Sequence, residues 1–243
     1  NDLRVDLKKI NIGDFAPFFI KENRLEGLLS GQVDVIDPFG RMNVDVKAEA
    51  EQFRLDDDSV GKLVLTTNYS KATGKVNFTT LSENKNYNFN VTGFVNTLDS
   101  ARDNAIDINT ELRGTSISLL NRYLTDIFSQ LDGQATGNLR IVGKGNNLKY
   151  LGNIQLKDGQ LMVDYTKCLY LVPEAKIKLT EEGIDFGSFT IKDQLGNTGE
   201  LVTGKLYHSN FKDMGFDFKV RTNRMLLLNT TARDNSQFYG RAI

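Results

Sequence analysis

The chain lacks most residue types from which catalytic and metal centres are built. Its 243 residues include one cysteine, one histidine and no tryptophan. A single cysteine excludes a disulfide within the chain, and a single histidine excludes a metal site with two or three histidine ligands. We expect Cys168 to be a buried structural thiol and His208 to lie on a strand edge or loop. The sequence thus predicts neither an enzyme nor a cofactor.

Proline, long apolar runs and excess charge are also scarce. Three prolines leave room for long uninterrupted strands. No stretch reaches the roughly 18 apolar residues of a membrane-spanning helix. The 30 Lys and Arg balance 31 Asp and Glu, so there is no basic stripe for nucleic acid or for anionic lipid headgroups. Both ends of the chain are interpreted as cuts in a longer protein.

Two short motifs have the composition of an ion site but not its spacing. Asp56-Asp57-Asp58 lacks the spaced oxygen ligands and closing Glu of a calcium loop. Gly143-Lys144-Gly145 lacks the spacing of a phosphate-binding loop, and no helix follows it. Both are interpreted as solvated turns, and no metal site is predicted.

Alternation of apolar and polar residues dominates what is present and predicts an all-β fold. Met42 to Ala50 is the clearest example, with apolar residues at even positions and polar or charged residues between them. Turns are predicted at 58–61, 70–74, 83–86 and 143–147, with a hairpin turn at Lys157-Asp158-Gly159. Two helices are expected, one amphipathic at 116–130 capped by Ser116 or Ser118, and a shorter one at 15–21 capped by Asp14.

The two halves of the chain repeat one another. Leu25–Val35 aligns with Leu131–Ile141, and Gln52–Leu55 meets Asp158–Leu161 with no intervening gap. We therefore expect an elongated, curled antiparallel sheet of two loose repeats, with segments 1–115 and 116–243 continuous with one another. The alternation fits either a closed sandwich core or a trough with an open apolar groove. The expected groove-lining residues are Val44, Val46, Leu63, Leu65, Phe78, Phe89, Val91, Ile108, Leu139, Ile141, Ile154, Leu156, Val163, Phe216 and Phe218.

The second half resembles the carboxy-terminal region of the TamB family, within the AsmA-like superfamily. The resemblance depends on an ordered series of short elements, and the asparagine-rich style is similar to that of Bacteroidetes members. The matching elements are Leu131-Asp-Gly133, Gly137–Ile141, Gly152–Val163, Leu169–Leu171, Asp193–Asn197, Val202–Leu206, Phe211, Leu227–Thr231 and Phe238–Ala242.

This resemblance implies a trough-shaped sheet in a non-enzymatic protein of diderm bacteria. Such proteins are anchored in the inner membrane, cross the periplasm and partner an outer-membrane barrel of the TamA or BamA type. The implied role is bridge-like transport of phospholipids, whose acyl chains would be the ligand. The alternative is a chaperone-like scaffold for assembly of outer-membrane proteins. A carbohydrate-acting β-solenoid enzyme would need an acid–base pair and stacking aromatics that the sequence does not supply.

Overall fold

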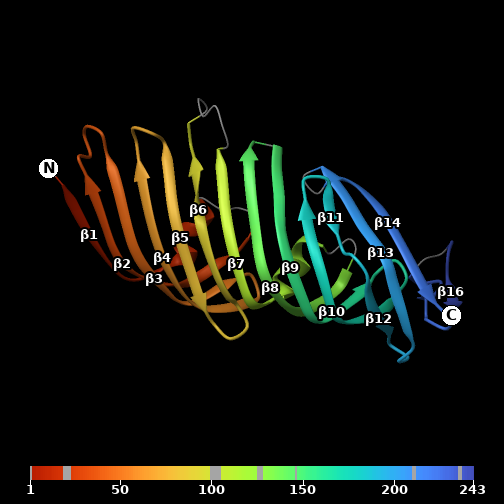
Figure 1. Cartoon of the computed structure of the whole chain (residues 1–243). Helices are drawn as coiled ribbons and strands as arrows, with labels where there is room; N and C mark the ends of the chain where they lie inside the picture. The colour runs from red at the N-terminus through yellow and green to blue at the C-terminus, as the bar shows by residue number, and fades with distance from the viewer. Residues whose placement is uncertain are drawn as a thin grey trace. The chain divides into compact units, whose positions relative to one another are not determined.

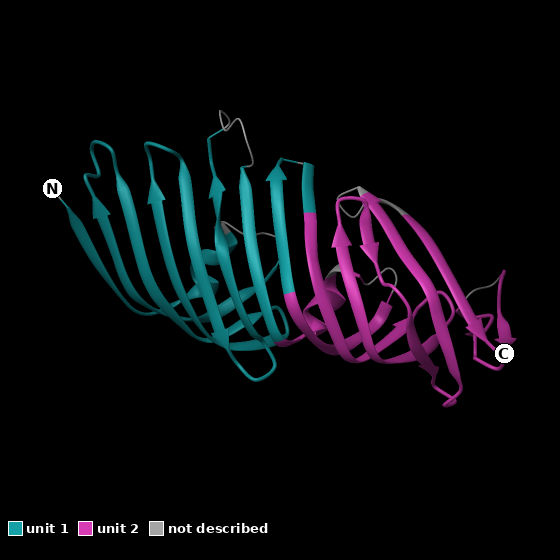
Figure 2. Cartoon of the chain, in the orientation of Figure 1, with its two compact units in different colours: residues 1–113, 138–149 teal, residues 114–137, 150–243 magenta. Residues whose placement is uncertain are grey.

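The computed structural model describes residues 2–18, 23–98, 105–124, 128–145, 147–209, 212–234 and 237–243. The chain is 72% strand and 6% helix, with a curled antiparallel sheet, which confirms the predicted all-β fold. It divides into two compact units (Figure 2). Unit 1 contains residues 1–113 and 138–149, and unit 2 contains 114–137 and 150–243.

Unit 1 is a meander in which each strand pairs antiparallel with the next strand of the chain. Tight turns at 71–74 and around 84–87 connect strands as predicted, but the turn predicted at 58–61 lies two residues earlier, at Asp56-Asp57. Asp56 has a φ of 52°, which an aspartate tolerates in a two-residue hairpin turn. The strands are β1 (Leu3–Asn11), β2 (Leu25–Ile36), β3 (Asn43–Leu55), β4 (Asp58–Ser70), β5 (Lys75–Glu83), β6 (Asn88–Asn96) and β7 (Ile106–Ser116), labelled in Figure 1.

Unit 2 starts as a meander and then branches. β10 pairs with β9 along one side and with both β11 and β12 along the other. β13 pairs with β11, β12 and β14, while β15 and β16 form a separate two-stranded sheet. The strands are β8 (Phe128–Lys144), β9 (Asn147–Val163), β10 (Cys168–Thr180), β11 (Gly183–Asp185), β12 (Phe189–Asp193), β13 (Thr198–Ser209), β14 (Lys212–Thr222), β15 (Leu228–Thr230) and β16 (Gly240–Ala242). β7, β8 and β9 have residues in both units.

The helices are shorter than the sequence predicts. The predicted helix at 116–130 is only the 3-10 helix η2 (Ile117–Tyr123), and residues 128–130 already belong to β8. Its predicted cap is confirmed, because the Ser116 side chain accepts from the Ser118 amide at 3.2 Å. The first helix is α1 (Ile12–Phe15) followed by the 3-10 helix η1 (Ala16–Phe18), and residues 19–22 lie outside the described residues. Asn11, not Asp14, is its cap.

The sequence repeat corresponds to a repeated packing motif. A Cβ added to Gly31 would collide with the backbone at Lys47 and Ala48, and one added to Gly137 would collide with that at Asn153, 106 residues further on. Glycine is required where two backbones approach this closely. In each repeat the amide of a strand residue with positive φ also donates to the hydroxyl of the residue before this glycine. Lys9 N donates to Ser30 Oγ at 3.1 Å, and Gly114 N to Thr136 Oγ1 at 3.0 Å.

The prediction of a hairpin turn at Lys157-Asp158-Gly159 is wrong, because all three residues lie inside β9. Asp158 has a φ of 51°, and its counterpart Gln52, inside β3, has a φ of 52°. Both are irregular positions within a strand. Asp-Gly favours positive φ whether the chain turns back or only bulges, so the dipeptide alone cannot distinguish the two.

In each repeat, the short helix packs against one strip of the sheet. In unit 1, Ile12 and Ala16 form a cluster with Ala50 of β3. In unit 2, Ile117 of η2 packs against the cluster of Leu156, Val172 and Ala175. Ala50 and Leu156 are equivalent positions of the repeat. The helices therefore provide local cores at the same place in each unit.

Candidate functional site

One face of the unit 1 sheet consists of four apolar rows that run across β2 to β7. Residues in a row are directly paired neighbours on successive strands, so their side chains lie on the same side. We name each row after its β2 residue. The rows are Val35-Val44-Tyr69-Val76-Val95-Ile106, Val33-Val46-Thr67-Phe78-Gly93-Ile108, Gly31-Ala48-Leu65-Thr80-Val91-Thr110 and Leu29-Ala50-Leu63-Ser82-Phe89-Leu112.

The opposite face of the same strands is polar. One row there reads Gln32, Lys47, Thr66, Thr79, Thr92 and Asn109. Beside it, Arg140 binds Asp107 with two hydrogen bonds, 2.9 and 2.7 Å long. The hydrogen bond from Arg140 lowers the pKa of Asp107 despite the opposing effect of burial. The carboxylate is therefore charged at neutral pH, and this face presents water-facing groups.

The apolar rows are covered unevenly. The helix cluster of unit 1 packs against Leu29, Ala50 and Leu63, all in the Leu29 row. Every residue of the Val33 and Val35 rows is only half-buried. In a closed sandwich, the facing residues of both sheets would be buried between them. Within the described part of unit 1, these two rows therefore form an open apolar strip, which the Gly31 row separates from the helix-covered Leu29 row.

Unit 2 also has a row of apolar residues across its sheet, and the side chains at one end of this row are larger. A row of paired residues crosses β9, β10, β11, β13 and β14, and we call it the Leu179 row. Phe216 ends the row and is 54% exposed, and Phe218 beside it is 47% exposed. Phe218 contacts Phe186 and Phe216, with ring centroids 5.7 and 6.2 Å away. The row consists of Gly152, Leu179, Ile184, Leu206 and Phe216.

The structure places the sequence-predicted lining residues in these faces, unit by unit. Those on β3 to β7 all belong to the four rows of unit 1. On β9, Ile154 pairs with Ile177 and Leu156 with Ala175, while Val163 pairs with Cys168 at the turn into β10. Leu139 and Ile141 are half-buried on β8. The prediction did not include Val33, Val35, Val76, Val95, Leu179, Ile184 and Leu206, which lie in these rows. The same alternation contained the signal for these residues.

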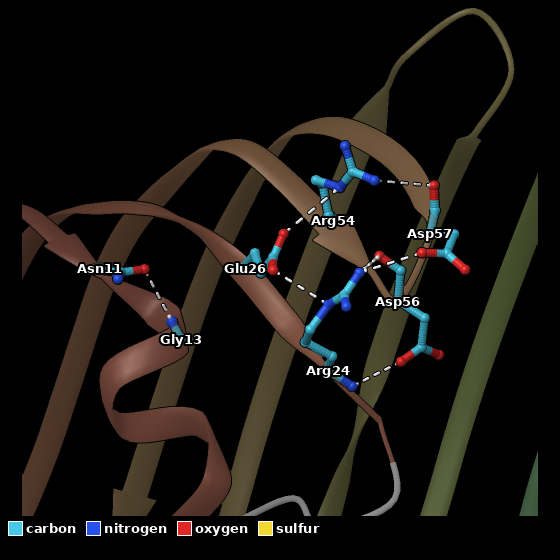
Figure 3. A network of polar contacts seen from close by, with 7 residues as sticks. All are labelled: Asn11, Gly13, Arg24, Glu26, Arg54, Asp56 and Asp57. Carbon is cyan, nitrogen blue, oxygen red and sulfur yellow. Dashed lines mark hydrogen bonds and ion pairs between the residues drawn. The ribbon is translucent and has the colours of Figure 1, made fainter.

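The acidic turn is occupied by protein groups rather than open to a cation (Figure 3). One carboxylate oxygen of Asp56 accepts a hydrogen bond from the Arg24 amide at 2.7 Å, which Figure 3 shows. The other accepts one from Asn23 Nδ2 at 3.1 Å. Arg24 Nη2 binds Asp57 Oδ1 at 3.2 Å, and Arg24 Nε lies 3.1 Å from Glu26 Oε1. The cluster therefore closes the β3–β4 turn onto the start of β2.

The remaining reactive side chains have structural surroundings. Cys168 is fully buried, and its thiol donates to the Thr166 carbonyl at 3.4 Å. His208 lies edge-on to Tyr150 with ring centroids 5.8 Å apart, and burial lowers its pKa. Burial also raises the pKa of Tyr170, whose hydroxyl donates to the Leu226 carbonyl at 3.0 Å. None of these contacts places a nucleophile beside a base.

Comparison with known proteins identifies no relative. No family model matches the chain, and neither curated proteins nor solved structures give a significant match. Among the described residues, no group of three or more acidic, histidine or cysteine side chains is arranged to hold a metal ion. Within the same residues, no helix has the length and apolarity needed to cross a bilayer. The apolar faces are therefore the feature from which a function can be argued.

Proposed function

We propose that the chain is a non-enzymatic, lipid-binding segment of an envelope-biogenesis protein. Its apolar faces would hold phospholipid acyl chains during transfer between the inner and outer membranes of a diderm bacterium. The observation that carries the proposal is the pair of half-buried apolar rows, Val33 and Val35, on the same face as the Leu29 row that the helix covers. The resemblance to the TamB family supports the periplasmic location and an outer-membrane barrel of the TamA or BamA type as partner.

The energetics favour an acyl chain as the occupant of these rows. Each methylene that leaves water contributes about 0.8 kcal/mol, so a chain lying along several strands gains substantially. In the Val33 and Val35 rows, the only polar side chains are those of Thr67 and Tyr69. Their hydroxyls can hydrogen-bond to water or to headgroup oxygens. The absence of charge within the rows avoids the cost of desolvating an ion.

The test is native mass spectrometry of the purified chain, with lipid extraction of the same sample. Phospholipid that co-purifies at a defined stoichiometry supports the proposal. A mass without lipid after gentle purification contradicts it.

A matched pair of variants tests which face binds. Phe78 lies in the Val33 row, and the adjacent Thr79 lies in the polar row on the opposite face. Phe78→Asp should abolish lipid co-purification because it places a charge among acyl chains, whereas Thr79→Asp should retain it. Circular dichroism checks that both variants fold. Equal lipid content in the two folded variants would refute the assignment of this face.

A scaffold for outer-membrane protein assembly is the second candidate. It is favoured by edge strand β14, whose partner on one side is β13 and whose exposed apolar residues include Phe216 and Phe218. A client strand could add to such an edge by main-chain hydrogen bonding. A photo-crosslinker at Val220, also exposed on β14, distinguishes the candidates. Capture of barrel-protein strands favours the scaffold, and capture of lipid alone favours the conduit.

A further inference from the structure

The open apolar strip of unit 1 lies along one edge of its sheet. The Val35 row is the last apolar row before the β2–β3 turn at 37–42 and the β4–β5 turn at 71–74. Figure 1 shows both turns on the same edge of unit 1, and the β5–β6 turn on the opposite edge. We call residues 37–42 and 71–74 the open edge. A ligand on the open apolar strip lies beside it.

The two turns of the open edge are hydrogen-bonded to one another. The Lys71 amide donates to the Met42 carbonyl at 3.0 Å, so Lys71 lies beside the Arg41-Met42 segment. The Asp37 carboxylate accepts the Arg41 amide at 2.8 Å, and the Asp37 carbonyl accepts the Met42 amide at 3.0 Å. These contacts hold the backbone of Arg41 close to that of Lys71, and the two cationic side chains begin from neighbouring positions.

Both of these side chains are exposed, and neither makes an ion pair within the part of the chain that the structure describes. The carboxylates close to the β2–β3 turn are used by its backbone instead. Asp37 accepts the Arg41 amide, and Asp2 accepts the Asp37 amide at 3.2 Å. The guanidinium of Arg41 has five N–H donors and the ammonium of Lys71 has three, so both can bind a ligand.

The arginines at the opposite edge of unit 1 are paired (Figure 3). Arg24 Nε lies 3.1 Å from Glu26 Oε1, and Arg24 Nη2 lies 3.2 Å from Asp57 Oδ1. Arg54 Nε lies 3.6 Å from Glu26 Oε2. The helix-covered Leu29 row lies toward this edge. The arginine beside the open strip is therefore available to an anion, whereas those beside the covered strip are already bound to carboxylates.

An apolar strip that ends at two cations matches an amphiphile with apolar chains and an anionic group at one end. We propose that Arg41 and Lys71 bind the phosphate of a phospholipid whose acyl chains lie on the open apolar strip. Phosphate oxygens accept charge-assisted hydrogen bonds from both guanidinium and ammonium groups. Tyr69 adds a hydroxyl in the Val35 row, two residues before Lys71. The inference rests on the proposed lipid-binding function and adds to it a preference for lipids that carry phosphate.

Competition between two lipids with the same acyl chains tests the phosphate site. Dioctanoyl phosphatidic acid and dioctanoylglycerol differ only in the phosphate, and an equimolar mixture is added to the delipidated chain before native mass spectrometry. Wild type should carry the phosphatidic acid at least about tenfold more often, because hydrogen bonds between charged groups contribute at least that factor in affinity. The double variant Arg41→Gln/Lys71→Gln should carry the two lipids in equal amounts.

A control variant removes two charges elsewhere. Lys47→Gln/Lys85→Gln changes one exposed lysine on the polar face and one in the β5–β6 turn at the opposite edge, and it should keep the wild-type preference. All four substituted side chains are exposed, so both double variants should fold, which circular dichroism checks. Inorganic phosphate at the lipid concentration should not displace the phosphatidic acid, because it lacks the acyl chains that occupy the strip.

The outcomes separate this inference from the proposed function. Equal binding of the two lipids by wild type, or an unchanged preference in Arg41→Gln/Lys71→Gln, would overturn the phosphate site and leave the apolar strip as a lipid site. Loss of the preference in the control variant as well would assign it to overall charge and would also overturn the site. Displacement by inorganic phosphate would identify a site for free phosphate and overturn the assignment to a lipid. Binding of neither lipid to wild type would refute the proposed function and the phosphate site together.

Discussion

Replacing Asp193 should destabilise unit 2 more than any other single change to a carboxylate. Asp193 is buried at the end of β12, and its two oxygens accept four hydrogen bonds. The donors are the amides of Leu195 at 2.9 Å, Asn197 at 2.8 Å and Leu226 at 2.7 Å, and Asn197 Nδ2 at 3.0 Å. One side chain thus connects the β12–β13 turn to the segment before β15.

The magnitude follows from these four bonds. An amide left buried without an acceptor costs about 1–3 kcal/mol, and a hydrogen bond to a charged group contributes about 1.5–3 kcal/mol. The Leu226 amide is the most buried donor, and the turn amides can partly recover by binding water. We therefore expect Asp193→Ala to lower the free energy of unfolding by about 4 kcal/mol. Asn197→Ala removes only the Nδ2 bond and should cost about 1 kcal/mol.

Urea unfolding followed by far-ultraviolet circular dichroism measures both variants, and hydrogen exchange over residues 189–226 localises the effect. The reasoning is refuted if Asp193→Ala costs no more than Asn197→Ala.

The same carboxylate predicts a pH dependence. Burial acts to raise the pKa of Asp193, but hydrogen bonds from Asn197, Leu226 and Leu195 outweigh it, so the pKa lies below its ordinary value. A carboxylate whose folded pKa is depressed stabilises the fold fully above its unfolded pKa of about 3.9, and this contribution is lost as pH falls through the folded value. Acid titration of wild type against Asp193→Asn should therefore show the difference in stability shrinking below about pH 4.

Three further changes have definite expected outcomes. Asn11→Ala removes the side-chain cap of α1 and should cost about 1 kcal/mol; an unchanged urea midpoint would exclude the cap. Gly137→Ala forces a Cβ into the backbone at Asn153 and should cost more than about 2 kcal/mol, so a thermal midpoint equal to that of wild type would contradict this close approach. Tyr170→Phe leaves the Leu226 carbonyl without its hydroxyl donor and should cost about 1 kcal/mol, visible as faster hydrogen exchange near residue 226. Unchanged exchange there would contradict a stabilising role of this hydroxyl.

The apolar face could be predicted from the sequence because strand alternation is a local signal. Val44, Val46 and Phe78 each stand between polar neighbours, and the pleat alone assigns them to one face. The openness of that face could not be predicted, because apolar alternation is the same in a closed sandwich. It depends on how far the short helix reaches, and among the four rows of unit 1 the described helix packs against residues of the Leu29 row alone.

The local errors have a common physical origin. Asp158-Gly159 favours positive φ, and a bulge needs positive φ as much as a hairpin turn does. β9 pairs with β10 both before and after this dipeptide, so the dipeptide forms a bulge. The apolar spacing of Leu124, Ile127 and Phe128 suggested a longer helix. Phe128 instead begins β8, so the tertiary pairing of a long strand overrides a helical pattern at its start.

The pairing of each strand with its chain neighbour from β1 to β7 has a consequence for how the protein is made. From β2 to β6 each hairpin closes over a loop of two to six residues, so the entropy lost in forming the next contact is small. Unit 1 can therefore assemble in the order in which it is synthesised, each new strand adding to a template that is already folded. The chain could thus begin to fold before its last residues emerge from the ribosome.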